Sequence, residues 1–173
     1  ALTSGADDAV AFQWANMTAS QQAALNVVPF SSTSTSDTNG ADRLAYVRGD
    51  QTREGAASVS FRKRDPTVLG DIANSTPAYV GPPAKFSFDA SYRTFKTNYA
   101  TRTPMLYAGG NDGMLHGFSA TNGVEQIAYI PGPVFGNLTL LTDQAYAQRH
   151  RYFVDGSPTV DDIKFDSGSG SDD

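Results

Sequence analysis

The sequence predicts a mainly β fold with short helices. Its 173 residues include 16 glycines and 9 prolines, which suits short strands with frequent reversals. Three strand-like runs, residues 105–109, 114–119 and 125–130, are separated by the turn signals Asn-Asp-Gly at 111–113 and Thr-Asn-Gly at 121–123. Glycine supplies the positive φ that such turns need, so the runs form an antiparallel meander. A meander of this kind is most of one β-propeller blade, so we expect a partial, modified propeller that is incomplete without downstream blades.

Length and composition allow one domain, or part of one, and exclude several kinds of chemistry. The formal charge of -5 and the pI near 4.8 leave no basic surplus for a phosphate backbone, so nucleic acid is excluded as a partner. No stretch approaches the roughly 20 apolar residues that cross a bilayer, so we expect no membrane insertion. The absence of cysteine excludes disulfides and thiolate metal sites.

Three regions follow one another along the chain. Residues 1–66 read as a lead-in with short helices and a Ser/Thr-rich loop, and residues 67–165 as the first propeller blade or blades with inserted helices. Residues 166–173 read as a disordered acidic Gly/Ser tail. Because this tail follows a strand-like run with no partner in sight, we expect the chain to stop inside a larger domain.

The lead-in contains two helix signals. Thr18 and Gln21 have the spacing of a capping box, which predicts a short helix that begins near Thr18. A second short helix is expected over residues 42–47, ending at Gly49, because glycine suits the left-handed position after a helix end. The polar residues 31–40 between them predict a surface loop.

Residues 51–66 carry charges that nearly cancel. The charged residues of interest are Arg53, Glu54, Arg62, Lys63, Arg64 and Asp65. We expect a solvated connector whose exposed ion pairs contribute about 0 to 1 kcal/mol each.

An aromatic stripe marks the middle of the chain. Phe88, Tyr92, Phe95 and Tyr99 recur at helical spacing, so they lie on one face of a helix that Asp89 can cap. Packing of this face against a sheet is the favoured interpretation, because such rings bury large areas. A carbohydrate-binding platform is the alternative.

The remaining expected elements flank the meander. They are a strand at residues 77–81, a helix from residue 132 with an apolar face of Val134, Leu138 and Leu141, and two strands at residues 152–154 and 159–165 joined through residues 155–158.

No pattern of polar residues predicts catalysis. His116 and His150 lack metal-ligand spacing, and we expect His116 to be a hydrogen-bonded packing residue. Asp71, Asp112 and Asp155 adjoin glycines or turns, where carboxylates accept bonds from backbone amides. We therefore expect no catalytic, cofactor-binding or metal-binding residue in this chain.

One tripeptide is a candidate receptor-binding site. Arg48, Gly49 and Asp50 can present a guanidinium and a carboxylate to an integrin-type receptor when they lie in an exposed loop. The favoured interpretation is structural: Gly49 ends a helix, and Arg48 and Asp50 pair locally.

Three ordered motifs carry a resemblance to a known family. They are VLGDIANSTP at residues 68–77, YAGGNDGMLHGF at 107–118 and YFVDGSP at 152–158. Together they resemble the C-terminal propeller domain of the PilC/PilY family, the type IV pilus tip-associated adhesins and assembly factors of bacteria. Residues 12–14 and 20–25 are similar to the family's lead-in to that domain.

The resemblance implies a non-enzymatic protein that promotes pilus assembly and adhesion. It implies an exported protein at the pilus tip, the outer membrane surface or the extracellular space. The implied partners are pilin subunits or minor pilins, a host-cell or abiotic surface, and the remaining blades of the same protein. Family propellers bind calcium in an acidic loop, but here Asp37 is the sole acid in the Ser/Thr stretch before Arg48. We therefore expect no cofactor in this chain, and calcium in downstream blades.

A quinoprotein dehydrogenase propeller is the alternative. Its blades also contain strand pairs around Asp-Gly followed by a Thr-Asn-Gly type turn. Such an enzyme would bind pyrroloquinoline quinone, and it needs cofactor-stacking and calcium-ligating residues at the central channel. No such set is identified in these 173 residues.

Overall fold

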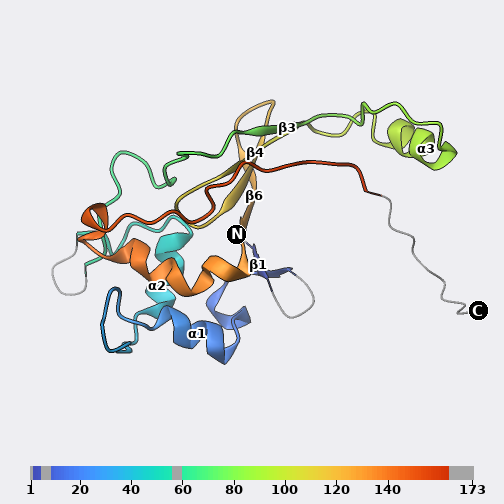
Figure 1. The fold of residues 1–173 in the computed structure, drawn as a ribbon. Coiled ribbons are helices and arrows are strands. Elements are labelled where there is room, and N and C mark those ends of the chain that lie inside the picture. Colours follow the sequence, from blue (N-terminus) through green and yellow to red (C-terminus); the bar gives the residue numbers. More distant parts are fainter. Residues whose placement is uncertain (1, 5–8, 56–59, 164–173) are drawn as a thin grey trace, which may run out of the picture.

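The computed structural model of the chain describes residues 2–4, 9–55 and 60–163. Its strands are β1 (Leu2–Ser4), β2 (Ala9–Ala11), β3 (Ala78–Val80), β4 (Met105–Gly109), β5 (Leu115–Ser119) and β6 (Glu125–Ile130). Its helices are α1 (Ala19–Leu25), α2 (Gly40–Val47) and α3 (Ala90–Asn98), with the 3₁₀ helices η1 (Trp14–Asn16), η2 (Gly132–Thr142) and η3 (Tyr146–Gln148). Figure 1 shows the sheet between a cluster that contains α1 and α2 and an arm that ends in α3.

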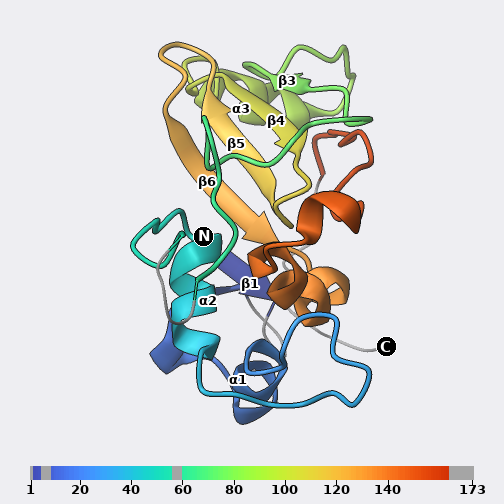
Figure 2. The ribbon, with the colours of Figure 1, turned by 90° about the vertical axis from the view of Figure 1, so that its left-hand side faces the viewer.

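The predicted meander is confirmed. β4, β5 and β6 pair antiparallel in chain order, and β3 pairs antiparallel with β4, within the strand expected at residues 77–81. The two turn glycines have the positive φ that the turns require, +93° at Gly113 and +73° at Gly123. These four strands run side by side across the sheet in Figure 2. The mainly β blade with short helices is therefore as expected.

Two short strands extend the sheet where none was expected. The sheet order is β2-β1-β6-β5-β4-β3, and β1 lies parallel to β6, with Leu2 opposite Tyr129. Every other pair is antiparallel. The sequence predicted no strand in the lead-in. Three-residue strands carry too little alternation to be recognised, and these two are defined by the pairing of β1 with β6 and of β2 with β1.

Both helices of the lead-in are confirmed. The side-chain oxygen of Thr18 accepts a bond from the Gln21 backbone, and the Gln21 side chain accepts one from the Thr18 backbone, so the capping box is complete. The second helix begins two residues earlier than expected, at Gly40, whose N–H donates to the Asn26 side chain over 2.8 Å. Gly49 follows its end with φ +105°.

One hydrophobic core joins the lead-in to the sheet and to the segment after β6. Its buried members are Phe12, Met17, Leu25, Leu44, Tyr46, Val47, Phe61, Met114, Ala128, Ile130, Phe135, Leu138, Leu141 and Tyr146. Contributions therefore come from both sides of residue 66, where the sequence suggested a boundary. The helix expected from residue 132 is present as the 3₁₀ helix η2, and it buries Leu138 and Leu141 of the three apolar residues named for its face.

The solvated connector expected at residues 51–66 is only partly confirmed: Lys63 and Asp65 form an exposed ion pair, but a second pair is buried. Arg64 and Glu54 form a buried pair, with 2.6 Å between Nε and Oε1 and side chains only 6% and 5% exposed. Arg64 also donates to the backbone oxygens of Tyr46 and Asp50. In the sequence, a run of balanced charges suggests exposure to solvent. In the structure, the Arg64 guanidinium instead donates to backbone oxygens at the edge of the core.

The aromatic stripe forms the predicted helix but not the predicted packing. Asp89 caps α3 by accepting a bond from the Ser91 N–H. No residue of α3 is buried, Tyr99 is 48% exposed, and Phe88, just before the helix, is 86% exposed. Figure 1 shows the reason, since α3 lies at the end of the arm, away from the sheet. In the described part of the chain, no sheet covers this face. Asp162 binds Tyr92, and Tyr92 and Phe95 are half-buried.

The two strands expected after residue 151 are not formed. Residues 151–163 lack strand pairing in the described structure, and they are held beside residues 74–102 by side-chain bonds such as Tyr92 Oη to Asp162 Oδ2, at 2.8 Å. A strand needs a ladder of backbone bonds, whereas the described part of this segment makes one backbone bond, from the Val154 N–H to the Gly110 oxygen at 3.4 Å. Residues 164–165 and the expected tail at 166–173 lie outside the described residues. Within the described ranges, no helix is long and apolar enough to cross a membrane.

Candidate functional site

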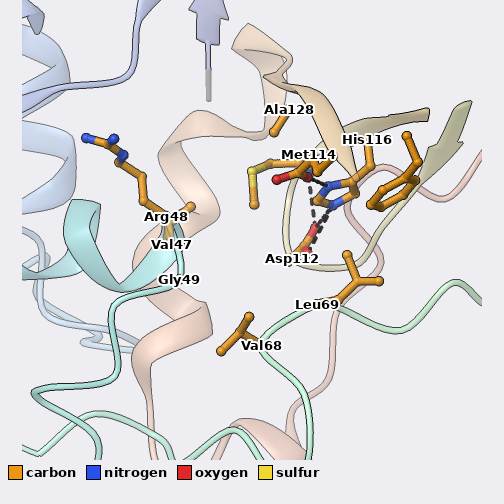
Figure 3. A pocket seen from close by; sticks show the side chains of 11 residues that line it. Val47, Arg48, Gly49, Val68, Leu69, Asp112, Met114, His116 and Ala128 are labelled. Atoms are coloured by element: carbon orange, nitrogen blue, oxygen red, sulfur yellow. Dashed lines mark hydrogen bonds and ion pairs between the residues drawn. The ribbon is translucent and has the colours of Figure 1, made fainter. Parts of the chain in front are cut away.

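His116 is buried at the centre of a polar cluster whose two acids are partly exposed. β5 carries it, and its imidazole is held between two carboxylates (Figure 3). Nδ1 lies 2.6 Å from Glu125 Oε1, and Nε2 lies 3.0 Å from Asp112 Oδ1. The ring also stacks on Phe118, with 5.7 Å between centroids. The expectation that His116 is a hydrogen-bonded packing residue agrees with this geometry.

The tight turn between β4 and β5 places Asp112. The turn closes with Gly113 at positive φ, and Asp112 is thereby brought back over His116 four residues later. The Asp112 carboxylate accepts two further bonds, from the Gly70 N–H at 2.8 Å and the Met114 N–H at 3.3 Å. The acceptors of Asp112 are therefore used to fix the turn to the segment that precedes β3.

The cluster controls the charge of His116. Burial disfavours the imidazolium, but the hydrogen bonds and charges of Asp112 and Glu125 outweigh burial, so the pKa of His116 is raised above 6.5. A protonated His116 donates to both carboxylates at once. His116 thus links Asp112 of the turn to Glu125 of β6.

A second group of polar side chains, Asp71, Asn111 and His150, lies beside the His116 cluster. Asp71 accepts a bond from the Asn111 side chain at 2.7 Å and lies 3.2 Å from His150 Nε2. Burial raises the pKa of Asp71, but the bonds to Asn111 and His150 prevail and lower it. The expected bonds from backbone amides are confirmed for Asp112 and for Asp155, which accepts from the Asn74 N–H. The Asp71 carboxylate instead binds side chains.

A cavity of about 290 Å³ opens beside the cluster. Its polar wall is the Asp112, His116 and Glu125 cluster, and its apolar wall contains Val47, Val68, Leu69, Met114, Phe118 and Ala128. The polar groups of this wall are bonded to one another. Within the described ranges, no group of three or more His, Asp or Glu side chains is arranged to hold a metal ion.

The candidate receptor-binding tripeptide forms the end of α2. The Gly49 N–H donates to the Tyr46 oxygen and the Asp50 N–H to the Ala45 oxygen, which is a Schellman motif. Asp50 Oδ1 accepts a bond from the Thr52 N–H at 2.7 Å. The expected helix end at Gly49 is confirmed, but among the described residues no ion pair joins Arg48 to Asp50. Both side chains are exposed, and Figure 3 shows the Arg48 guanidinium pointing away from His116.

Sequence reasoning missed the association of His116 with its two acids. Asp112 and His116 are four residues apart across a turn, and Glu125 reaches His116 from the next strand. The available signal was the pairing of β5 with β6. A register shift between Gly117 and Phe118 sets Glu125 opposite Phe118, which lies on the same face of the strand as His116. Register, rather than residue spacing, carries that information.

The chain is similar to several type IV pilus proteins. The model of the PilY1 beta-propeller domain matches residues 69–171. The type IV pilus biogenesis factor PilY1 of Pseudomonas aeruginosa strain UCBPP-PA14 is 43% identical over 96% of this chain and 14% of its own length. A PilY1 homolog of Xylella fastidiosa strain Temecula1 is 41% identical over 71% of this chain and 10% of its own length. The chain thus spans about one-seventh or less of these relatives. No solved structure gives a significant match.

Proposed function

The chain belongs to the PilY1 β-propeller family, and we therefore propose that it is a non-catalytic part of a protein that supports type IV pilus assembly. The observation that carries the proposal is the β3–β6 meander, which lies within the residues matched by the family's propeller model. The hydrogen bonds of the polar cluster support a structural role, because Asp112 and His116 bind each other and Asp112 also binds the backbone.

The finer parts of the proposal concern place and contact. The protein is exported and acts at the pilus tip or outer surface, where it contacts pilin subunits and attaches to a host-cell or abiotic surface. The exposed Arg48 and Asp50 side chains support a surface contact at the end of α2. Their fixed Schellman geometry would present both groups without further ordering.

Replacement of a turn glycine tests the assembly role. In a bacterium that carries the complete gene, Gly113→Val forces a side chain into a backbone at φ +93°, with its Cβ 2.6 Å from Leu138 Cδ2. We expect surface pilin, sheared from the cells and measured by immunoblot, to fall several-fold. Gly136→Ala is the matched control, because a Cβ there meets nothing within 4 Å. Unchanged pilus number in the Gly113→Val strain and in a gene deletion would contradict the proposal.

Attachment is tested separately from assembly. Asp50→Ala removes the carboxylate, and Arg48→Ala removes the guanidinium, at positions outside the hydrophobic core. At equal pilus number, we expect both strains to attach less well to host cells. If attachment is unchanged, the tripeptide has only its structural role and the assembly proposal stands.

A further inference from the structure

Two segments of the chain share one sequence pattern. Residues 74–80 read NSTPAYV, and residues 155–161 read DGSPTVD. Both have Asn or Asp first, Ser or Thr third and Pro fourth. The first segment leads directly into β3.

The matching positions of these two segments bind each other. Asp155 Oδ1 accepts the Asn74 N–H at 3.2 Å, and Asp155 Oδ2 accepts the Asn74 side-chain amide at 2.6 Å. Ser157 Oγ accepts the Thr76 N–H at 2.9 Å. Both contacts join residues that are 81 positions apart. The segments thus lie in parallel, each position against its counterpart.

The turn between β4 and β5 is fixed to the residues that come just before each segment. On one side the Asn111 N–H donates to the Asp71 oxygen, and on the other the Phe153 N–H donates to Asn111 Oδ1 at 3.1 Å. The approach of the second segment is close, because a Cβ on Gly109 would lie 2.3 Å from the Val154 oxygen. The Gly109 N–H also donates to Ser75 Oγ of the first segment at 2.8 Å, so Gly109 lies between the first segment and the residue that precedes the second.

The two segments play different parts in this contact, so the backbone N–H groups of the second segment remain without an acceptor among the described residues. In the three shorter bonds the first segment gives N–H groups and the second gives side-chain acceptors, while the Ser157 hydroxyl also donates to the Asn74 oxygen at 3.5 Å. In the described part of the chain, the corresponding N–H groups of Asp155 and Ser157 donate to no acceptor. A head-to-tail contact of this kind can be repeated by a third copy of the element, and a ring closes when the rotation per copy allows it.

We propose that residues 74–80 and 155–161 open two successive repeats, and that the bonds from Asp155 and Ser157 are the joint between them. The N–H groups of Asp155 and Ser157 then receive the same acceptor pair, a carboxylate and a hydroxyl two residues apart, from a third repeat of the same protein. This inference rests on the proposed propeller and deepens it, because it names the contact that sets one blade beside the next.

A swap of the two side chains tests the joint in the 173-residue chain. Asn74→Asp sets two carboxylates against each other, and Asp155→Asn sets two amide groups against each other. The double variant restores one donor and one acceptor. We expect each single variant to lower Tm by about 2–4 °C and the double variant to recover most of that loss. A double variant with the summed loss of both single variants would overturn the joint.

Amide hydrogen exchange tests the open side. In the 173-residue chain we expect slow exchange at Asn74 and Thr76 and fast exchange at Asp155 and Ser157. In the complete gene product, all four amides should exchange slowly. Fast exchange at Asp155 and Ser157 in that product, beside slow exchange at Val160, would overturn the third contact while leaving the propeller intact. Failure of the proposed function is distinguishable, because it is read from pilus number.

Discussion

At the scale of single residues, His116 links the stability of the blade to pH. Its pKa is raised in the folded chain, so protonation of His116 stabilises the fold. The contribution is full below the unfolded pKa of about 6.5 and is lost as pH rises through the higher folded value. The direction follows from Asp112 and Glu125, which favour the imidazolium.

We expect the free energy of unfolding of His116→Gln to fall less steeply above pH 6.5 than that of the native chain. The measurement is the urea midpoint of the native chain and the variant at several pH values. Glu125→Gln, which keeps His116 but removes one acid, should move the loss to lower pH. A His116→Gln variant with the same pH dependence as the native chain would contradict this account.

Asp37 shows the opposite sign. Burial raises its pKa, but the bonds from Arg43 and Asn39 prevail and lower it to about 2. Its contribution is therefore present above the unfolded value of 3.8 and is lost as pH falls toward 2. Both Arg43 terminal nitrogens bind this carboxylate at 2.7 Å.

Asp37→Asn should lower the free energy of unfolding at pH 7 by about 2 kcal/mol. The matched control is Asp42→Asn. It removes the carboxylate that pairs with Arg53, and because this carboxylate is more exposed than that of Asp37, the free energy of unfolding should fall by less than about 1 kcal/mol. Both values come from urea denaturation. Equal losses in the two variants would show that the Asp37 pair has no special weight.

At the scale of elements, the sequence predicted features that depend on neighbouring residues, but it did not predict features that depend on residues far along the chain. The capping box at Thr18 and the turn glycines at 113 and 123 act within a few residues, so the sequence contains all that determines them. The packing of α3 and the strands expected after residue 151 depend on partners elsewhere. Neither an exposed helix face nor an unpaired strand can be recognised from its own residues.

Thr18 offers the sharpest test at this scale. Thr18→Ala removes the acceptor for the Gln21 N–H and should cost about 1 kcal/mol in the free energy of unfolding. Thr18→Ser keeps the hydroxyl and should be near neutral. Chemical denaturation of both variants measures the difference, and an equal loss in both would assign the effect to the methyl group instead.

At the scale of the whole molecule, two regions differ in how completely they are covered. The lead-in, η2 and one end of the sheet share a closed core. The arm and the last described segment instead expose large apolar side chains, including Tyr79, Phe86, Phe88, Tyr152 and Ile163. We propose that these side chains form an interaction surface. Further blades of the same protein are the partners that the family membership favours for it.

Calcium should leave the melting temperature of this chain unchanged. The ion requires six to eight oxygen ligands, and the described residues contain no suitable cluster of acidic or histidine side chains. Thermal unfolding in millimolar calcium, compared with the chelated sample, measures this. A rise in Tm would place a calcium site in the chain.

The central claim is that β3–β6 form one blade of a ring and that the next blade opens at residue 159. An experimental structure of the complete gene product tests it most directly. We expect residues 159–163 to be the first strand of a neighbouring sheet, with Asp155 and Ser157 still bonded to Asn74 and Thr76. If residues 159–163 instead pair with β3 in the same sheet, or if that sheet has no neighbours in a ring, the account is contradicted.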